Sequence, residues 1–350
     1  MNCTETSEFI ITEDATILQA MEQIDKSTRK ILFVHSDGKL LAAVSDGDIR
    51  RWILKGGKLN ESIKNAANYQ PIFIKEDKRY QAERIMKKNT IDALPIINED
   101  GQIKEIVFLN KFDKEYDRFP EHIPVIIMAG GTGSRLLPYT NILPKPLIPI
   151  GELPIVEHII NQFKKFGCDD FRMIVNYKRN MIKAYFNELE KDYSLTFVSE
   201  EKPLGTGGGL SLLKGSIQGT FILTNCDILI DEDLGKAYRH HKEQGNEITM
   251  ICSLKNYILP YGIVNIGQNG NINSIQEKPE MSFYTNTGCY FVESEVVERL
   301  TYNEFVDFPN IISEYLEEGR KVGVYPIGEN AWLDMGQMDE MEKMKARLEC

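Results

Sequence analysis

The most constraining feature of the chain is an unbroken apolar run, Val125–Ala129, that leads directly into the glycine-rich segment 130–133. A run that is apolar at every position predicts a strand buried on both faces, as in the parallel sheet of an α/β domain. Glycines after such a strand expose converging backbone amides, and a helix that starts there adds positive potential. The pattern therefore predicts an α/β domain in which this loop, followed by a helix, binds phosphate groups.

The residues around the loop exclude two common phosphate-binding motifs. A Walker A sequence is absent, and Leu136 stands where a dinucleotide fingerprint has its third glycine. Instead, Arg135 ends the loop, and Lys145 lies between two prolines ten positions later (145 minus 135). Two cations held in this way can neutralise a triphosphate from two sides. A tight turn with a proline-rich surface loop is the alternative, but it does not explain cations beside glycines in a chain of net charge -11.

Segments 128–140 and 144–147 together resemble the signature of the sugar-1-phosphate nucleotidylyltransferases, and the resemblance extends over about residues 123–348. It implies a Rossmann-like, mostly parallel sheet flanked by helices, which we assign to residues 123–350. It also implies transfer of a nucleotidyl group from an NTP to a sugar 1-phosphate, with release of pyrophosphate. Arg135 would hold the outgoing phosphates and Lys145 the reacting phosphoryl group. The resemblance further implies nucleotide contacts from the loop residues Ala129, Gly130, Gly131, Gly133 and Ser134.

Two aspartates are the predicted metal ligands. The attacking phosphate oxygen is already anionic, so the reaction needs charge neutralisation rather than a general base. Asp227 follows the apolar segment 221–225, which places it at the ligand side of a parallel sheet. Asp334 stands in a Trp-Leu-Asp-Met-Gly segment, and both aspartates match the metal ligands of the family. Either aspartate alone is more simply a turn or cap residue, but the matched pair predicts Mg²⁺ as the cofactor.

Three further segments carry the predicted sugar site. Gly262 permits close approach of a ligand to the backbone. Glu277 and Lys278 belong to a Glu-Lys-Pro motif, in which the resemblance implies that the carboxylate binds sugar hydroxyls and the lysine binds the sugar phosphate. Asn286 and Thr287 belong to an Asn-x-Gly motif that meets the hexose in the family. The resemblance thus implies a catalytic set that consists of Arg135, Lys145, Asp227 and Lys278.

The choice of base depends on one loop. The segment 203–209 resembles the base-and-ribose loop of the family, with nucleotide contacts from Gly205, Thr206 and Gly207. Its Pro-Leu-Gly-Thr-Gly sequence favours GTP, and CTP is the alternative. Further along the chain, the amphipathic segment 338–348 predicts a helix whose apolar face packs in the core or in a dimer interface.

The first third of the chain contains an internal repeat. Equivalent residues recur 63 positions apart (77 minus 14, 97 minus 34, 101 minus 38). Each copy predicts a short strand (9–12 and 72–75), a helix (16–27 and 79–89) and a hairpin with an Asp-Gly turn (31–45 and 93–108). This duplication resembles a pair of CBS domains of βαββα type, over about residues 8–117. We assign residues 1–118 to this module, joined to the transferase by the charged, proline-broken segment 111–122.

CBS pairs bind adenine nucleotides between their copies, so the resemblance implies a regulatory nucleotide. In the first copy, Ser45 and Asp48 match the ribose-binding positions. In the second copy, Phe108 and Lys111 replace that pair, so we expect one nucleotide rather than two. The alternative is that Ser45 and Asp48 only cap the helix that follows them.

The fusion of a CBS pair to a short transferase resembles the glucosamine-1-phosphate guanylyltransferases of legionaminic acid biosynthesis. Two alternatives remain open: a CTP-dependent transferase that acts on a sugar or another phosphate, and a non-catalytic nucleotide sensor. A sensor should have lost a catalytic cation or a metal ligand. An enzyme is favoured because the chain retains Arg135, Lys145, Asp227, Lys278 and Asp334.

Composition restricts the partners further. A net charge of -11 argues against nucleic acid and anionic membranes. The first residues lack a signal-peptide pattern and no apolar stretch approaches the length of a membrane span, so we expect a cytoplasmic protein. The scattered cysteines form no Cys-x-x-Cys pair and predict neither a disulfide framework nor a zinc site. Both module types often self-associate, so the resemblance implies a homo-oligomer.

Overall fold

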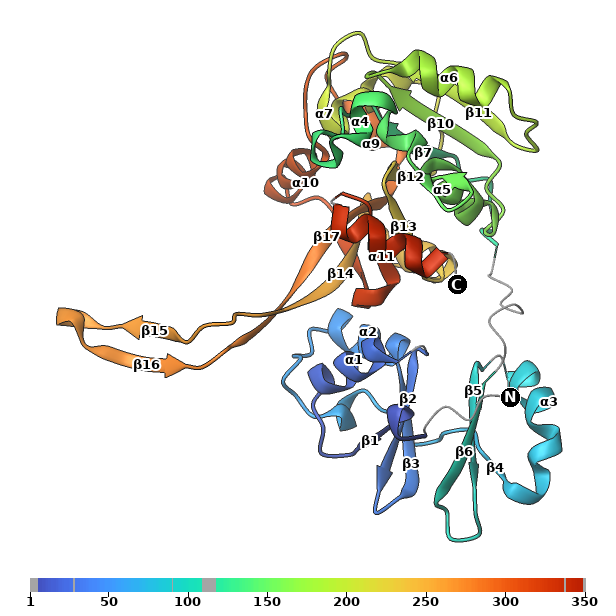
Figure 1. The fold of residues 1–350 in the computed structure, drawn as a ribbon, viewed down its shortest axis with the longest axis vertical. Helices are drawn as coiled ribbons and strands as arrows, with labels where there is room; N and C mark the ends of the chain where they lie inside the picture. Colours follow the sequence, from blue (N-terminus) through green and yellow to red (C-terminus); the bar gives the residue numbers. More distant parts are fainter. Residues whose placement is uncertain (1–5, 28, 90, 109–117, 337, 349–350) are drawn as a thin grey trace. The chain divides into compact units, whose positions relative to one another are not determined.

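The computed structural model describes residues 6–27, 29–89, 91–108, 118–336 and 338–348. The chain forms two compact units, residues 1–115 and 116–350, each with its own sheets (Figure 1). Most of the predicted linker, and Lys111 with it, lies outside the described residues. Among the described helices, none is long and apolar enough to cross a bilayer.

The first repeat of the N-terminal unit is a three-stranded sheet. Along the sequence, one helix precedes its β-hairpin and a second helix follows it. Strand β1 pairs with β2 in parallel, and β2 pairs with β3 antiparallel. Thr16 starts the first helix with a capping box, in which its hydroxyl accepts from the Gln19 amide while the Gln19 side chain accepts from the Thr16 amide. The elements are β1 (Ile10–Thr12), α1 (Ile17–Lys26), β2 (Ile31–Ser36), β3 (Lys39–Ser45) and α2 (Asp46–Leu54).

The second repeat has the same order of strand, helix and hairpin, and the same strand pairings. Both hairpins are bulged at equivalent positions, because Leu41 and Lys104 (104 minus 41 is 63) are each left without a partner in the register. The helix begins later than predicted because residues 76–81 form a 3-10 helix. The elements are β4 (Ile74–Lys75), α3 (Ala82–Asn89), β5 (Ala93–Ile97) and β6 (Ile103–Phe108).

The second unit is built on a seven-stranded sheet of order β11-β10-β7-β12-β17-β14-β18. Strands β11, β10, β7 and β12 are parallel, β17 runs against them, and β14 and β18 return to the first direction. The predicted Rossmann-like, mostly parallel sheet is therefore confirmed. The strands are β7 (Val125–Ala129), β10 (Asp170–Val175), β11 (Ser194–Ser199), β12 (Thr220–Asn225), β14 (Ile248–Ile258), β17 (Glu280–Glu293) and β18 (Val322–Ile327).

Central strand β7 shows why the apolar run is uninterrupted. Val125, Ile127 and Ala129 lie in one buried cluster, whereas Ile126 lies in a second cluster on the opposite face. Burying a large aliphatic side chain contributes about 1.5–3 kcal/mol, so apolar side chains on both faces of this strand stabilise both layers. The strand thus joins two cores.

Helices cover both faces of this sheet (Figure 1). The first face packs against α5 (Ile155–Lys164), α6 (Arg179–Asn187), α8 (Leu234–Gln244) and α11 (Met338–Leu348), and the second against α9 (Ser294–Arg299) and α10 (Phe308–Glu317). The predicted C-terminal helix 338–348 is confirmed, and its Met341 and Met344 are buried in the first core. Two helices are short. Helix α4 (Tyr139–Ile142) follows the glycine loop 130–133, and α7 (Gly205–Gly208) lies within the predicted base loop 203–209.

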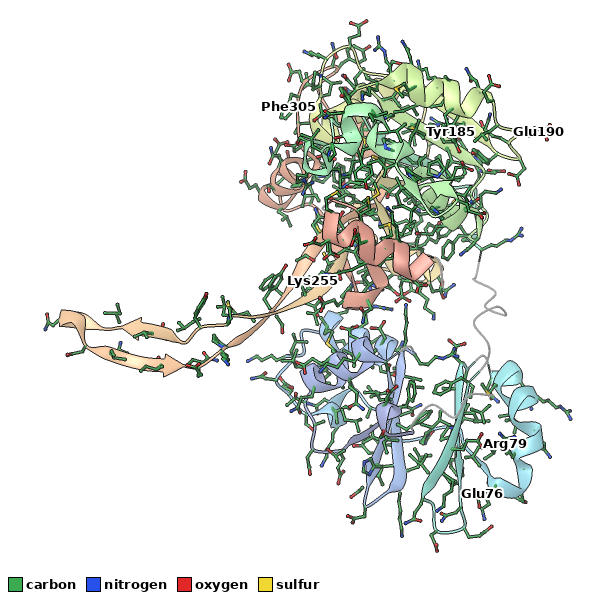
Figure 2. The ribbon with its side chains drawn as sticks, viewed as in Figure 1. Glu76, Arg79, Tyr185, Glu190, Lys255 and Phe305 are labelled. Atoms are coloured by element: carbon green, nitrogen blue, oxygen red, sulfur yellow. The ribbon has the colours of Figure 1, made fainter. Side chains whose placement is uncertain are left out.

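Strands β14 and β17 continue beyond the sheet as a two-stranded ribbon. Their antiparallel register extends without a shift from the pair Cys252 and Asn286 to the pair Ile258 and Glu280. Strands β15 (Ile263–Ile266) and β16 (Ile272–Gln276) then prolong the ribbon to its tip (Figure 1). We call residues 256–284 the arm. Lys255 lies at its root, with its ammonium 3.4 Å from Glu329 Oε1 (Figure 2).

Candidate functional site

The glycine loop leaves the carboxyl end of β7 in the middle of the sheet. Gly133 has a left-handed φ of 67°, and a Cβ there would lie 2.8 Å from Thr140 Cγ2 and 3.2 Å from Lys145 Cβ. The Thr140 hydroxyl donates a 3.0 Å hydrogen bond to the Gly133 carbonyl. The glycine therefore lets the segment that carries Lys145 pack directly against the loop.

The regular helix expected after the loop is not formed. Ser134–Leu136 is a single 3-10 turn, and the following α4 has only four residues (Tyr139–Ile142). Pro138 stands directly before α4 and interrupts any continuous helix. The prediction of a helix N-terminus at the phosphates was wrong, and positive charge at this loop comes instead from Arg135 and Lys145.

Lys145 and Asp227 meet at the carboxyl edge of β7 and β12. Lys145 starts the short 3-10 segment Lys145–Leu147, and its Nζ donates a hydrogen bond to Asp227 Oδ2. Their side chains are exposed by only 12% and 10%. Buried charges require a partner of opposite sign, and each of these two groups supplies it for the other.

A short ladder brings Asp334 beside Asp227. Strand β13 (Ile228–Ile230) is antiparallel to β19 (Trp332–Asp334), and Ile228 is opposite Asp334. Burial raises the pKa of Asp334, the negative charge of Asp227 raises it further, and the Gly336 amide, Lys145 and Arg135 oppose that shift. Two neighbouring carboxylates that repel one another are stabilised when a cation lies between them.

The pair therefore fits a divalent cation such as Mg²⁺, which prefers one or two carboxylates with nucleotide oxygens and water as its other ligands. Among the described residues, no cluster of three or more histidine, cysteine or acidic side chains could hold a metal by protein groups alone. A metal held by these two carboxylates would need further ligands, such as phosphate oxygens and water.

A cavity of about 230 Å³ opens at this edge of the sheet. The residues that line it include the predicted Arg135, Thr206, Asp227, Asn286, Thr287 and Asp334. The structure thus gathers predicted phosphate, metal and hexose residues from five segments of the chain into one cavity.

The Asn-x-Gly segment is held firmly where it borders the cavity. The Asn286 amide donates a 2.6 Å hydrogen bond to the Tyr290 hydroxyl, and its Oδ1 accepts from the Gly288 amide at 2.9 Å. The Thr287 hydroxyl donates to the Ile251 carbonyl at 2.7 Å. Gly288 has a φ of 82°, which lets Asn225 pack against the strand. The two predicted hexose residues therefore have fixed orientations.

The glycines of the predicted base loop serve packing as well. The amides of Gly207 and Gly208 both donate to the Val306 carbonyl at 2.9 Å, and the Thr206 amide donates to Asp307 at 2.9 Å. A Cβ on Gly207 would lie 2.6 Å from Ile311 Cδ1. The absence of side chains at these positions lets α10 lie against the loop. That Gly205, Thr206 and Gly207 bind nucleotide remains a prediction.

Part of the predicted sugar site lies outside the cavity. Gly262 and Glu277 lie together, since a Cβ on Gly262 would be 2.9 Å from Glu277 Oε2. Both residues and Lys278 are on the exposed arm, and none of them lines the cavity. Lys278 has a left-handed φ of 42°, an unfavourable conformation for a residue with a side chain. Within one chain, the Glu-Lys-Pro motif therefore lies on the arm, apart from the Asn-x-Gly motif that lines the cavity.

Sequence reasoning missed Glu200, which follows β11 and lies behind both glycine loops. A Cβ on Gly130 would be 2.9 Å from Glu200 Oε2, and one on Gly209 would be 2.5 Å from Oε1. Burial raises the pKa of Glu200 to about 6, against hydrogen bonds from Asn176 and Leu204. Oε1 has no hydrogen-bond partner among the described residues. An acidic residue at the end of a strand, directly before a glycine-rich loop, was the signal that could have identified it.

In the N-terminal unit, Ser45 and Asp48 contact one another. Ser45 Oγ donates to Asp48 Oδ2 at 2.6 Å, and the Ser45 amide donates to the same oxygen at 2.9 Å. Together they form the capping box of α2. In the second copy, Phe108 packs on Phe9 with ring centroids 4.7 Å apart. The cap is thus present in the structure, and a ligand role for the same pair remains a prediction.

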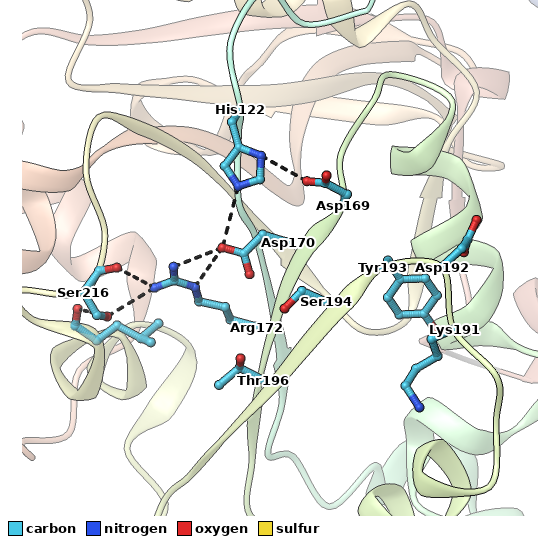
Figure 3. A pocket seen from close by; sticks show the side chains of 11 residues that line it. His122, Asp169, Asp170, Arg172, Lys191, Asp192, Tyr193, Ser194, Thr196 and Ser216 are labelled. Atoms are coloured by element: carbon cyan, nitrogen blue, oxygen red, sulfur yellow. Dashed lines mark hydrogen bonds and ion pairs between the residues drawn. The ribbon is translucent and has the colours of Figure 1, made fainter.

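A larger cavity, about 840 Å³, lies at the opposite edge of the sheet, where β10 and β11 begin (Figure 3). His122 lies 3.0 Å from Asp169, and Arg172 donates to both Asp170 and the Ser216 carbonyl (Figure 3). None of the predicted site residues lines this cavity. Ligands of parallel α/β sheets bind at the carboxyl ends of the strands, so the smaller cavity is the candidate site.

Comparisons with known proteins agree with this assignment. A family model described as nucleotidyl transferase matches residues 124–349, and a model described as CBS domain matches residues 5–55. The bifunctional protein GlmU of Methanococcus aeolicus is 30% identical over 221 residues, which cover 61% of this chain and 51% of that protein. A mannose-1-phosphate guanyltransferase of Pichia angusta is 31% identical over 226 residues, covering 61% of this chain and 60% of that protein. The chain thus spans about half to three fifths of the length of these relatives.

Solved structures share the fold of the second unit. HddC from Yersinia pseudotuberculosis matches with a TM-score of 0.52 and 21% identity, over 65% of this chain and 99% of that protein. The same protein complexed with GMP-PN matches with a TM-score of 0.51. The family model extends over well more than half of the chain and includes the glycine loop, both aspartates and the cavity. The chain therefore belongs to the nucleotidyl transferase family and carries a CBS domain at its N-terminus.

Proposed function

We propose that the protein transfers a nucleotidyl group from an NTP, preferably GTP, to a hexose 1-phosphate and releases pyrophosphate. The observation that carries this proposal is that Arg135, Asp227 and Asp334 line one cavity beside the glycine loop, where Lys145 is hydrogen-bonded to Asp227. Two cations and two carboxylates gathered in this way suit a triphosphate with a divalent metal.

In the proposed reaction, an oxygen of the sugar phosphate attacks the α-phosphorus of the NTP. The new P–O bond forms as the bond to the β-phosphate oxygen breaks, and pyrophosphate leaves with that electron pair. Arg135 binds the leaving phosphates, and Lys145 stabilises the charge that develops at the α-phosphate. Asp227 and Asp334 would hold Mg²⁺, which would supply further charge neutralisation at the phosphates. No proton has to move, because the nucleophile is already anionic.

Glu200 supports GTP as the nucleotide. Guanine presents two adjacent donors, N1–H and N2–H, and a carboxylate can accept from both. The imide edge of uracil and thymine has carbonyl oxygens beside its single N–H and would repel a carboxylate. Cytosine offers an amino donor beside an acceptor, so CTP is the second candidate. Glu200 does not line the cavity, but its Oε1 has no hydrogen-bond partner among the described residues and lies against Gly209 of the base loop, which supports it as the acceptor.

The identity of the hexose is the part of the proposal that the site residues restrict least. Asn286 and Thr287 border the cavity with fixed orientations, which suits hydroxyl recognition. Relatives named for mannose 1-phosphate and glucose 1-phosphate support a hexose 1-phosphate as the class. The fused CBS module supports glucosamine 1-phosphate, and legionaminic acid biosynthesis as its setting, in the cytoplasm.

The N-terminal module would bind one regulatory nucleotide at Ser45 and Asp48. Such a ligand changes catalysis only if it binds two arrangements of the protein with different affinity. The proposed transferase activity does not depend on this regulatory nucleotide.

A pyrophosphate-release screen tests the enzymatic proposal. Four NTPs are combined with a panel of hexose 1-phosphates, with Mg²⁺ and with excess chelator. We expect turnover with GTP and an amino or neutral hexose 1-phosphate, and its loss with chelator. Release of pyrophosphate with no combination would overturn the proposal.

A further inference from the structure

The arm keeps Lys278 of each chain away from that chain's own cavity. Asn286 lines the cavity, and Glu280 at the other end of the ladder lies six positions away along regular strand (286 minus 280). At about 3.3 Å per position, this distance along the strand is about 20 Å. Lys278 lies two residues farther along, so its side chain cannot contact a sugar phosphate beside Asn286 of the same chain.

The ribbon cannot simply fold back. The register continues without a shift from Asn286 to Glu280, and the Leu259 amide then donates to the Pro279 carbonyl at 3.1 Å. Moving Lys278 to its own cavity would break this ladder of backbone hydrogen bonds. Each bond that is lost without replacement destabilises the fold by about 0.5–1.5 kcal/mol. The arm is therefore directed outward by the same strands that form the site.

The arm also exposes apolar side chains. Tyr261, Ile266, Ile272 and Ile275 are exposed by 77%, 73%, 60% and 64%. A two-stranded ribbon alone is marginally stable in water, and an exposed apolar surface of this kind marks a protein contact. The side chains of β15 and β16 stand along the ribbon outside the sheet that carries the site (Figure 2).

We propose that the arm of a second copy of this chain enters the cavity and supplies Lys278 and Glu277 in trans. This inference rests on the proposed function, since it assigns the sugar phosphate to Lys278. A second copy is the occupant that fits, because its arm carries the lysine that the proposed function assigns to the sugar phosphate, and neither Lys278 nor Glu277 lines the cavity of its own chain. A two-fold pair thus completes both sites by one exchange. Apolar residues of the arm would be buried in the same contact.

Complementation between two impaired variants tests the exchange. Asp227→Asn impairs the cavity and Lys278→Ala raises KM through the arm, so each homodimer should have little activity at sugar-phosphate concentrations near the wild-type KM, where the assay is run. The two chains are co-expressed with different tags and purified through both. If the arms are exchanged, the intact cavity of the Lys278→Ala chain receives the intact arm of the Asp227→Asn chain. One of the two sites is then complete, so we expect about half of the wild-type activity. If each arm served its own chain, both sites would be defective and activity would stay at the level of the single variants.

A matched heterodimer serves as the control. Gln268→Ala changes an exposed residue at the arm tip and replaces Lys278→Ala in the pairing with Asp227→Asn. It should show about half of the wild-type activity in either arrangement. Recovery in the control without recovery in the test heterodimer would overturn the proposal, as would a wild-type protein that is monomeric at assay concentration.

A cross-link between chains gives a readout that needs no activity. Lys278→Cys on one tagged chain and Pro309→Cys on the other place one thiol on the arm and one at the cavity rim. Cys3→Ser and Cys350→Ser are added, and the remaining cysteines are buried. We expect a covalent heterodimer under mild oxidation, and none when Asp192→Cys, at the opposite edge of the sheet, replaces Pro309→Cys. A cross-link in a protein that turns over no NTP would sustain the arm exchange and reject the proposed function, whereas turnover without a cross-link would reject the exchange.

Discussion

The ammonium group of Lys145 donates a hydrogen bond to the carboxylate of Asp227, although 82 positions separate the two residues in the chain. The pair joins the segment packed on the glycine loop to the end of β12. Because both groups are buried, removing either one leaves the other charge uncompensated, which costs about 3–5 kcal/mol in comparable pairs. Substitutions here therefore have to be judged by folding as well as by turnover.

Asp227→Asn and Asp334→Asn should each abolish most turnover. Each change removes one of two carboxylates that would hold the metal, and the loss of one preorganised charge partner lowers kcat by about 100-fold or more. Steady-state rates at increasing Mg²⁺ check this expectation. Asp192→Asn, an exposed aspartate at the other edge of the sheet, is the control and should retain wild-type rates. Near-normal rates in either cavity variant would contradict the metal assignment.

The two lysines should differ in their kinetic effects. Lys145→Ala should lower kcat by about 100-fold or more, because a charge that stabilises the reacting phosphate is lost. Lys278→Ala should instead raise KM for the sugar phosphate, by the equivalent of a charge-assisted hydrogen bond of about 1.5–3 kcal/mol. Full saturation curves in both substrates separate the effects. The opposite pattern would mean that the roles are exchanged.

Local patterns allowed much of the fold to be predicted. The helix 16–27 is observed as α1 (Ile17–Lys26) with Thr16 and Ser27 as its caps, because the cap residues and the apolar spacing lie within one short segment. The repeat of 63 positions is confirmed by matching strands, helices and bulges. The buried strand at 125–129 is observed as the centre of the main sheet. In each case the information is contained in neighbouring residues.

The errors and omissions depend on tertiary packing. The helix expected after Gly133 is a 3-10 turn, because Pro138 and the contact with Lys145 shape the segment. The outward direction of Lys278 follows from a strand pairing that its own motif does not encode. Glu200 lies against both Gly130 and Gly209 because the two glycine loops meet in front of it. Sequence spacing carries no information about such long-range approaches.

Stability at low pH should depend on Glu293. Burial by itself raises its pKa, but hydrogen bonds from His241, Lys242 and Thr220 outweigh burial and lower the pKa to about 2. A lowered pKa in the folded state stabilises the protein above the ordinary value of 4.5, and this contribution disappears as the pH falls to about 2. Thermal unfolding of wild type and Glu293→Gln should therefore differ at pH 6 and converge between about pH 4.5 and 2. A constant difference across this range would contradict the assignment.

Asp48 should matter for nucleotide binding by the N-terminal module. Calorimetry of the full chain with AMP should give one site per chain, because Phe108 packs on Phe9 in the second copy. Asp48→Ala should weaken binding by about 1.5–3 kcal/mol through loss of a charge-assisted hydrogen bond to ribose. Asp48→Asn keeps an acceptor for the Ser45 amide and separates loss of the cap from loss of the charge. No binding of AMP by the wild type would reduce the pair to a helix cap.

Glu200 should determine the choice of base. Glu200→Gln replaces two acceptors by one acceptor and one donor, so kcat/KM for GTP should fall by the equivalent of about 1.5–3 kcal/mol, with no comparable loss for UTP. Because the wild-type pKa is about 6, GTP selectivity should also decline as the pH falls through 6, and Glu200→Gln should lack this dependence. Competition assays with paired NTPs between pH 5 and 8 measure both effects. Glu201→Gln, an exposed neighbour, is the control, and equal effects of the two substitutions would exclude Glu200 from base recognition.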